Sequence, residues 1–540
     1  VRGRPARAGG GSRQALDSVD TMPGAGAPAT ADDASSLHLA LLSDASQYDP
    51  LAAYIESHTT VLAARWGFPH DQFVFVCLLG LNYVFGALHP LLPRNRHVQY
   101  AYCLLVGFYG GWIMFGTNMW HTIVTSTVAL VAVRVVPRHL VGYVVFVFGM
   151  GWVVALHAYR LYTDYMGYHM DVTGSQMMVT LKMIAFAYSY MDGDASRVDA
   201  SKLSSWQRAN RIDDASLPSP LEYYAWVYNY MGFLAGPMFD LSEFRAYIDR
   251  SMFSKCGGRV PHTRFVQMCV KYGEAWLVWL CMTAIFKLVP AGSLESHYYR
   301  HEADAITRFV IMWCTAFTSR SSYYIAWRLA NGACCAAGIG YNQDTGKWDR
   351  GCNVIIMGVE TAQNVKNVTD SWNLKVDRWL KENVYLRVQL TPLRALAMPI
   401  TLTTSAMWHG LYPGYYFAFL SSGLKIQFDR MGRRLFRPYF VEADGITPKP
   451  FKWAYDLVTF LGHQWVFNYG MLPFLLLGYE QTMGHYGAWS FSGHAFIIAG
   501  LVLFTLLGGN KRPPRAATVT PVPVGSKVKK SSAAATKKQQ

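Results

Sequence analysis

Long runs without a charged residue restrict what this sequence can fold into. Runs that lack Asp, Glu, Lys and Arg include Gln72 to Pro93, the interval between Arg96 and Arg134, His139 to Tyr159, Leu457 to Tyr479, and Gln481 to Asn510. A helix needs about 20 apolar residues to cross a hydrocarbon core about 30 Å thick, and each run is long enough. The second run is long enough for a helical hairpin or two short crossings. Softer candidates, with one or more charges, are Gly174 to Met191, Leu221 to Phe239, Phe265 to Pro290 and Ala305 to Tyr341.

The composition agrees with a membrane protein. Only 15% of the 540 residues are charged and 52% are hydrophobic, whereas ordinary soluble domains carry about 25% charged residues. Backbone polar groups in lipid are satisfied only in helices or closed barrels, and these runs are too long and too uniformly apolar for barrel strands. The sequence therefore predicts an all-α polytopic membrane protein with about eight to twelve transmembrane or re-entrant helices around an internal cavity.

Three parts follow from the composition along the chain. Residues 1–48 are rich in Gly, Ala, Ser and Arg, which predicts a disordered extension or untranslated sequence ahead of a start at Met22. Residues 49–509 form the transmembrane domain, where helical apolar spacing from Leu51 to Trp66 predicts a helix along the membrane surface. Residues 510–540 are basic without a single acid, so the positive-inside tendency places this tail in the cytosol. The net charge of +15 is not distributed as in a nucleic-acid-binding protein.

Familiar catalytic and metal motifs are absent from the sequence. The nine cysteines form no CxxC pair, so we expect buried free thiols and no metal site. The sequence contains no GxSxG elbow, no HExxH and no Walker loop. No histidine has an aspartate five positions later, so the His-x4-Asp pair of soluble glycerolipid acyltransferases is missing as well.

His409 lies in an uncharged run from Ala395 to Leu424 that prolines and glycines interrupt. Broken helices at membrane depth are tolerated only where they pack in protein or line a cavity. An ionisable residue there is a functional candidate. The alternative, a hydrogen-bonded core imidazole, is about as frequent, and other histidines also lie in apolar runs: His121, His157, His463, His485 and His494.

The segment from Asp370 to Leu390 has an amphipathic pattern. Its apolar stripe contains Trp372, Val376, Trp379, Leu380 and Val384, and its charged side contains Lys375, Asp377, Arg378, Lys381 and Glu382. Opposite charges at i,i+4 support a helix that lies at the membrane interface. Asn373 stands beside the apolar stripe.

Two motifs in this region resemble a known family. "SWNLKVDRWLKENVYLR" followed by "SAMWHGLYPGYY" resembles the signature of the membrane-bound O-acyltransferase family, in its lysophospholipid acyltransferase branch. Three further stretches resemble the same branch: Met170 to Gly193, Tyr230 to Phe244 and Tyr323 to Asn342. The sterol and diacylglycerol branch is less similar, because its FYxDWWN box has no counterpart before Asn373.

The resemblance implies transfer of a fatty acyl group from acyl-CoA to a lysophospholipid hydroxyl, with Asn373 and His409 in the active site. An imidazole with a reference pKa of about 6.5 can remove the hydroxyl proton at neutral pH, so His409 is the expected general base. Asn373 either stabilises the oxyanion or holds the acceptor hydroxyl, and the sequence leaves both roles open. Alternatives are a protein, sterol or diacylglycerol acceptor and, less favoured, a transporter.

Residues near these motifs are candidate substrate contacts: Trp372, Trp379, Lys381, Arg387, Trp408, Tyr412 and Tyr415. The basic residues of the amphipathic segment are placed for the phosphates of acyl-CoA, although such a charge run is more often a solvated helix face. The tyrosines after His409 are candidates to line a substrate tunnel, although aromatic residues in membranes usually serve packing.

The remaining expectations concern partners and location. Acyl-CoA is a co-substrate and no cofactor is expected; the partners are lysophospholipid and membrane lipids, no nucleic acid, and a homodimer is compatible with the resemblance. The terminal "KKQQ" resembles a dilysine retrieval signal, which predicts a multi-pass protein of the endoplasmic reticulum. The sequon at Asn367 should stay unglycosylated if its segment faces the cytosol.

Overall fold

The chain is almost entirely helical. The structure is a computed structural model that describes residues 44–167 and 169–510. These ranges contain no β-strand, only two isolated bridges, which confirms the predicted fold class. Met22, the "KKQQ" end and most of the two predicted terminal parts lie outside the described residues. The fold already includes Asp44, whose carboxylate accepts hydrogen bonds from the backbone and hydroxyl of Thr117, both at 2.6 Å.

The helices follow one another with short connections. The first are α2 (Pro50–Trp66), α3 (His70–Leu88), α4 (Arg96–Phe115), α5 (Trp120–Val135), α6 (Arg138–Thr163), α7 (Val172–Asp192), α8 (Ser205–Ala209), α9 (Pro220–Val227) and α10 (Leu241–Ile248). Next come α11 (Arg264–Leu288), α12 (Ala305–Ala337), α13 (Ile356–Glu360), α14 (Val365–Thr369), α15 (Leu374–Leu380), α16 (Leu386–Gln389) and α17 (Ala397–His409). The last are α18 (Pro413–Phe436), α19 (Lys452–Met471), α20 (Pro473–Leu476), α21 (Tyr479–Ala488) and α22 (Ser492–Leu506).

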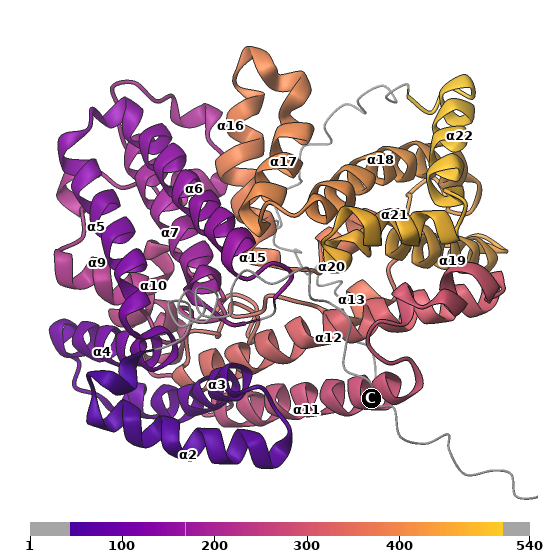
Figure 1. Cartoon of the computed structure of the whole chain (residues 1–540). Coiled ribbons are helices and arrows are strands. Elements are labelled where there is room, and N and C mark those ends of the chain that lie inside the picture. The colour runs from indigo at the N-terminus through magenta and orange to yellow at the C-terminus, as the bar shows by residue number, and fades with distance from the viewer. Residues whose placement is uncertain (1–43, 168, 511–540) are drawn as a thin grey trace, which may run out of the picture.

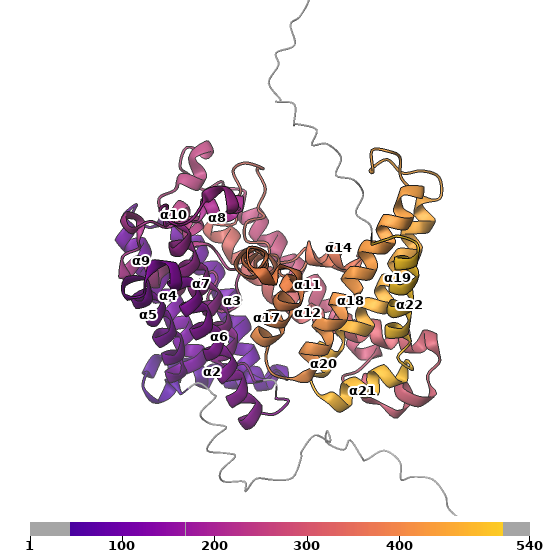
Figure 2. The same ribbon diagram turned by 90° about the horizontal axis from the view of Figure 1, so that it is seen from above.

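Two groups of helices flank a central segment. Helices α3 to α10 gather on one side and α18 to α22 on the other, with α17 between them (Figure 2). The long helices α11 and α12 run side by side across the lower half of the view in Figure 1. Helix α12 contacts α3 as well as α19, and its 33 residues correspond to about 50 Å of length. This helix therefore contacts both groups.

Helix α7 is the centre of the larger core. Nearly all its residues are buried, and the cluster around it includes Phe186, Trp226 and Trp379. Its lysine, Lys182, is buried and donates from Nζ to the carbonyls of Trp226 (3.2 Å) and Val227 (2.8 Å). An ammonium group without a counter-ion thus finds carbonyl partners inside the protein, as buried charges require.

Four helical stretches are long and apolar enough to cross a membrane. They are His70–Leu91, Arg96–Val135, Arg138–Thr163 and Arg264–Glu295. Helices α21 and α22 together make a fifth stretch, bent by 72°. The second stretch contains α4 and α5, joined by a 3-10 turn at Gly116–Met119, and it counts as one candidate span, so neither a helical hairpin nor two short crossings is confirmed. These counts concern the described residues, and the expected eight to twelve spans are not confirmed.

The amphipathic segment from Asp370 to Leu390 is not one continuous helix. It begins at Asp370, the C-cap of α14, and then contains α15, a π-helical turn (Lys381–Tyr385) and α16. The prediction of a solvated charged side is wrong for Lys375 and Glu382, which are buried. Both face polar groups of neighbouring segments: Lys375 contacts Glu243 and Glu382 accepts from Ser204. Helical periodicity cannot reveal such tertiary partners, so these charges were assigned to solvent.

Candidate active site

His409 is the last residue of α17, at the corner where the chain turns into α18. The helix ends there because Gly410 has φ 142°, a conformation open chiefly to glycine. Pro413 then begins α18 at its first position, where proline is favoured because it lacks an N–H. The corner is tight: a Cβ at Gly410 would lie 3.0 Å from the ring of Tyr415. The "WHGLYPGYY" sequence thus fixes a histidine at a helix break.

Aromatic rings surround the imidazole of His409. The ring centroids of Trp408 and Phe474 lie 4.8 Å from it, Phe419 stacks at 5.6 Å and Tyr415 lies at 5.9 Å. The side chain is half-buried. Its ring nitrogens make no hydrogen bond to any residue in the described ranges. This contrasts with the core imidazole that the sequence left as an alternative, because such a group would be hydrogen-bonded.

The neighbours of His409 are anchored to the N-terminal group of helices. Trp408 is buried and donates from Nε1 to the carbonyl of Met177 at 3.1 Å. The imidazole Nε2 of His157, on α6, lies 3.0 Å from the carbonyl of Trp408. The hydroxyl of Tyr412 accepts a hydrogen bond from the backbone of Met166 at 2.7 Å. The corner is therefore held by backbone contacts with α7 and with the end of α6.

Asn373 begins α15 with a left-handed backbone, φ 45° and ψ 50°. Its side-chain oxygen Oδ1 accepts from Nδ2 of Asn353 at 3.0 Å. The side-chain nitrogen Nδ2 of Asn373 has no hydrogen-bond partner among the residues that the structure describes. The atom of Asn373 that remains available is therefore a hydrogen-bond donor.

Trp372 packs in an aromatic cluster on α12. Its ring meets Tyr323 and Tyr324 at 5.7 Å and Trp327 at 5.0 Å, all edge-to-face. Tyr324 in turn donates its hydroxyl proton to Glu360 at 2.6 Å. These contacts fix the residue before Asn373 and leave its indole only half-buried.

The other candidate contacts differ in their freedom to meet a ligand. Trp379 is buried and donates to the carbonyl of Leu181 at 2.9 Å. Arg387 makes two bonds to Asp192, at 3.1 and 2.8 Å, and lies over the ring of Tyr188. The charge of Arg387 is thus balanced inside the protein. Lys381 is exposed, with its Nζ 4.0 Å from Glu382.

The segment of Asn373 contacts the helix of His409 through the π-helical turn that follows α15. Helices α15 and α17 both lie near the centre of the fold (Figure 1). Within the described residues no hydrogen bond joins Asn373 to His409. An acid–base group and a donor need no direct contact when they act on a substrate bound between them.

Two polar residues of this site were missed from the sequence. His157 was noted only as one of several histidines in apolar runs, and its contact with the Trp408 carbonyl depends on two segments far apart in the chain. Asn353 lies in a connection without helical periodicity, so no sequence signal identified it. The described residues contain no group of His, Cys, Asp and Glu that could hold a metal ion, and the nine cysteines are free.

Comparison with known proteins identifies the class. The family model of the membrane-bound O-acyltransferase family (MBOAT) matches residues 158–472, which include both Asn373 and His409. This chain belongs to that family, and it is a membrane-bound O-acyltransferase enzyme.

Curated relatives cover most of the chain. Lysophospholipid acyltransferase of Saccharomyces cerevisiae is 29% identical over 486 residues, 85% of this chain and 77% of that protein. Lysophospholipid acyltransferase of Schizosaccharomyces pombe is 31% identical over 376 residues, 67% of this chain and 72% of that protein. Human membrane-bound glycerophospholipid O-acyltransferase 2 is 28% identical over 471 residues, 83% of this chain and 86% of that protein.

Proposed function

We propose that this enzyme transfers a fatty acyl group from acyl-CoA to the free hydroxyl of a lysophospholipid. The relatives from both yeasts are named for this acceptor class, and the human relative is named for glycerophospholipids. The observation that carries the proposal is His409: a half-buried imidazole in an aromatic corner, without a hydrogen bond to the described residues. Such a ring is free to accept a proton from a substrate hydroxyl.

His409 acts as the general base in this reaction. Its neutral imidazole takes the proton of the lysophospholipid hydroxyl while the oxygen attacks the thioester carbonyl carbon. The tetrahedral intermediate then collapses: the C–S bond breaks, the ester C–O bond remains, and the imidazolium returns the proton to the departing thiolate. The aromatic walls keep water from the thioester, which limits hydrolysis.

Asn373 supplies the hydrogen bond for the developing oxyanion. The sequence left two roles open, and the contact with Asn353 favours this one, because it occupies Oδ1 and leaves the amide N–H groups. A donor aimed at an oxyanion is typically worth about 10² to 10³ in rate.

The substrates reach the site from two phases. Acyl-CoA comes from the cytosol, where the exposed ammonium of Lys381 is suited to a phosphate, and the lysophospholipid comes from the bilayer. We place the basic segment 511–540 in the cytosol, on the grounds of the positive-inside tendency, and the endoplasmic reticulum location stays a prediction. A homodimer stays a prediction.

An acceptor screen tests the proposal. The purified protein in lipid nanodiscs is given labelled acyl-CoA with lysophospholipids of several headgroups, diacylglycerol, cholesterol or a protein acceptor, and products are resolved by mass. We expect labelled phospholipid; a labelled polypeptide or sterol without labelled phospholipid would contradict the proposal.

Two histidine variants accompany the screen. His409→Ala should make no phospholipid above background. His494→Ala is the matched control, because His494 is also half-buried among aromatic rings but is hydrogen-bonded to Tyr469 at 2.7 Å and Ser421 at 3.3 Å. It should retain acyl transfer.

A further inference from the structure

The backbone of Asn373 is strained. A left-handed conformation costs most L-residues about 1–2 kcal/mol, and asparagine adopts it more readily because its side chain can hydrogen-bond locally; Asn373 has φ 45°. Strained residues persist only where the surroundings determine them more than once. The conformation of Asn373 therefore requires a local cause.

Asn353 supplies part of that cause through three hydrogen bonds. Its Nδ2 donates to Oδ1 of Asn373 at 3.0 Å, and its Oδ1 accepts from the backbone of Lys375 at 3.3 Å. Its carbonyl accepts from the backbone of Leu374 at 3.0 Å. One buried residue thus contacts three consecutive residues at the start of α15.

Lys375 also helps to fix the conformation of Asn373. Its side chain is only 6% exposed, and its Nζ lies 3.3 and 3.5 Å from the two carboxylate oxygens of Glu243 on α10. The ammonium also lies 5.2 Å from the ring centroid of Phe239. The chain two residues after Asn373 is therefore attached to a helix more than a hundred residues away in the sequence.

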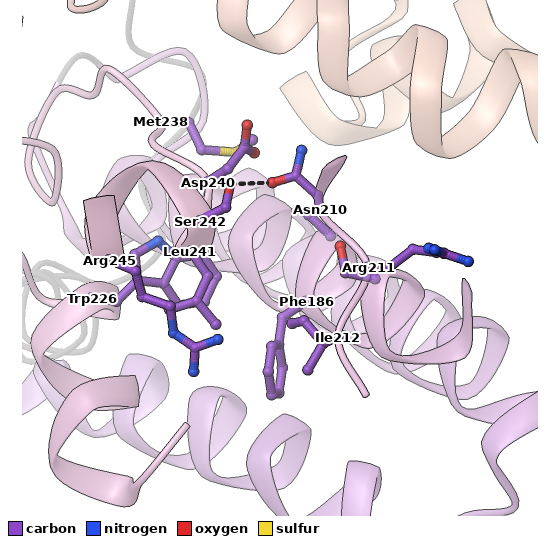
Figure 3. A pocket seen from close by; sticks show the side chains of 12 residues that line it. Phe186, Asn210, Arg211, Ile212, Trp226, Met238, Asp240, Leu241, Ser242 and Arg245 are labelled. Atoms are coloured by element: carbon purple, nitrogen blue, oxygen red, sulfur yellow. Dashed lines mark hydrogen bonds between the residues drawn. The ribbon is translucent and has the colours of Figure 1, made fainter. Parts of the chain in front are cut away.

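Glu243 is itself held in place. Its Oε2 accepts from the backbone of Asp240 at 3.2 Å, which closes a capping box at the start of α10. Asp240 accepts from the indole of Trp206 at 2.9 Å, and Ser242 donates to Asn210 beside a cavity of about 70 Å³ (Figure 3). The Glu243 carboxylate that pairs with Lys375 is thus held in position by its own neighbours.

A buried ion pair of this kind gives little net stability. The cost of removing two charges from water offsets their attraction, and apolar replacements are often neutral or stabilising. The pair between Lys375 and Glu243 fixes geometry instead, and the geometry it fixes is that of the residue proposed to hold the oxyanion. Among the residues that the structure describes, no ion pair contacts His409.

We propose that the Lys375–Glu243 ion pair and Asn353 together are a positioning device that holds Asn373 in its left-handed conformation with its amide directed at the reacting atoms. This rests on the proposed acyl transfer. Loss of the device leaves substrate binding intact and misplaces a donor that acts in the transition state. A misplacement of about 1 Å lowers turnover by roughly 10- to 100-fold.

A double-mutant cycle tests the device with the full-length protein in nanodiscs. Glu243→Gln should lower kcat with lysophospholipid and acyl-CoA by roughly 10-fold or more, with KM for both substrates unchanged. In an Asn373→Ala background the same substitution should lower kcat no further, since there is no donor left to position. A general structural defect would instead lower kcat by the same factor in both backgrounds.

Two further variants guard the interpretation. Glu222→Gln is the matched control. Glu222 pairs with Arg245, which lies on α10 like Glu243, and it makes no ion pair with α15. The kcat of this variant should therefore stay at the wild-type value. If Glu243→Gln does not fold, Lys375→Met breaks the pair and leaves Glu243 with its capping hydrogen bond and with Arg350. This variant should fold and show the same loss of kcat.

The possible results separate the two proposals. An undiminished kcat for Glu243→Gln, or an equal loss in the Asn373→Ala background, would overturn the positioning device and leave acyl transfer standing. Full activity of Asn373→Ala would overturn both the oxyanion role and the device. Absence of acyl transfer by the wild-type enzyme would overturn the proposed function and the device together.

Discussion

Asn373 and His409 occupy surroundings of opposite kinds. Asn373 is bound by hydrogen bonds and lies next to a buried ion pair, with Asn353 and Lys375 as its supports. His409 is enclosed by the rings of Phe419 and Phe474, without a hydrogen bond to the described residues. A hydrogen-bond donor must point at the oxyanion, and polar contacts fix that direction. A general base must keep a ring nitrogen free for the substrate proton, and aromatic neighbours leave it free because they form no hydrogen bond with it.

The largest effect is expected from His409→Ala. Loss of a general base should lower kcat by about 10²- to 10⁴-fold. Because aromatic walls without hydrogen bonds hold the ring, the vacated space should accept free imidazole, and added imidazole should restore part of the activity. The measurement is kcat of purified enzyme against imidazole concentration.

The matched comparison for this rescue is Asn373→Ala. It lowers kcat too, but imidazole should not raise its activity, because the missing group is a directed donor. Equal rescue of both variants, or near wild-type turnover of His409→Ala, would contradict the contrast between the two surroundings.

The second effect concerns Asn373→Gly. Glycine adopts φ 45° at little cost, so the variant should keep or raise the melting temperature while kcat falls by about 10²- to 10³-fold. Thermal unfolding and steady-state kinetics on the same preparation check this. A parallel loss of stability and activity would show that Asn373 is important for folding and not for the reaction.

A smaller effect is expected from Gly410→Ala, on the aromatic side. The new Cβ would lie 3.0 Å from the ring of Tyr415 at a φ that alanine avoids, so we expect a loss of about 1–3 kcal/mol in stability. Gly462→Ala is the control, because a Cβ at Gly462 of α19 meets nothing within 4 Å. That variant should be neutral or slightly stabilising; equal destabilisation by both would contradict the role assigned to the corner.

The sequence was sufficient for the fold class and the family, but not for the supports of the site. Uncharged runs and the motifs around Asn373 and His409 are formed by residues close together in the sequence. Such local patterns can be recognised without knowing the fold. The burial of Lys375 depends on Glu243, more than a hundred residues away, and helical periodicity assigned it to solvent. Arg387 was predicted to be free for phosphates, but in the fold it is paired with Asp192.

The smallest expected effect is a pH dependence of stability, which we expect in the polar surroundings of Asn373 and not in the aromatic surroundings of His409. Burial, and then the charge of Glu243, raises the pKa of Asp240 to about 7. Between the ordinary carboxyl value of about 3.9 and 7, the folded protein keeps a proton that the unfolded chain has lost. This contribution to stability is complete below the unfolded pKa and is lost as the pH rises through about 7.

Asp240→Asn should remove this pH dependence. Asparagine can still accept from Trp206 and cap α10, but it does not titrate, so the melting temperature of the variant should fall less than that of the wild type between roughly pH 4 and pH 7, the window between the unfolded and folded pKa. Phe474→Leu, in the aromatic corner, should keep the wild-type pH slope while lowering stability at every pH. A flat wild-type profile, or an unchanged slope in Asp240→Asn, would show that the polar support of Asn373 does not respond to protons through this carboxyl group.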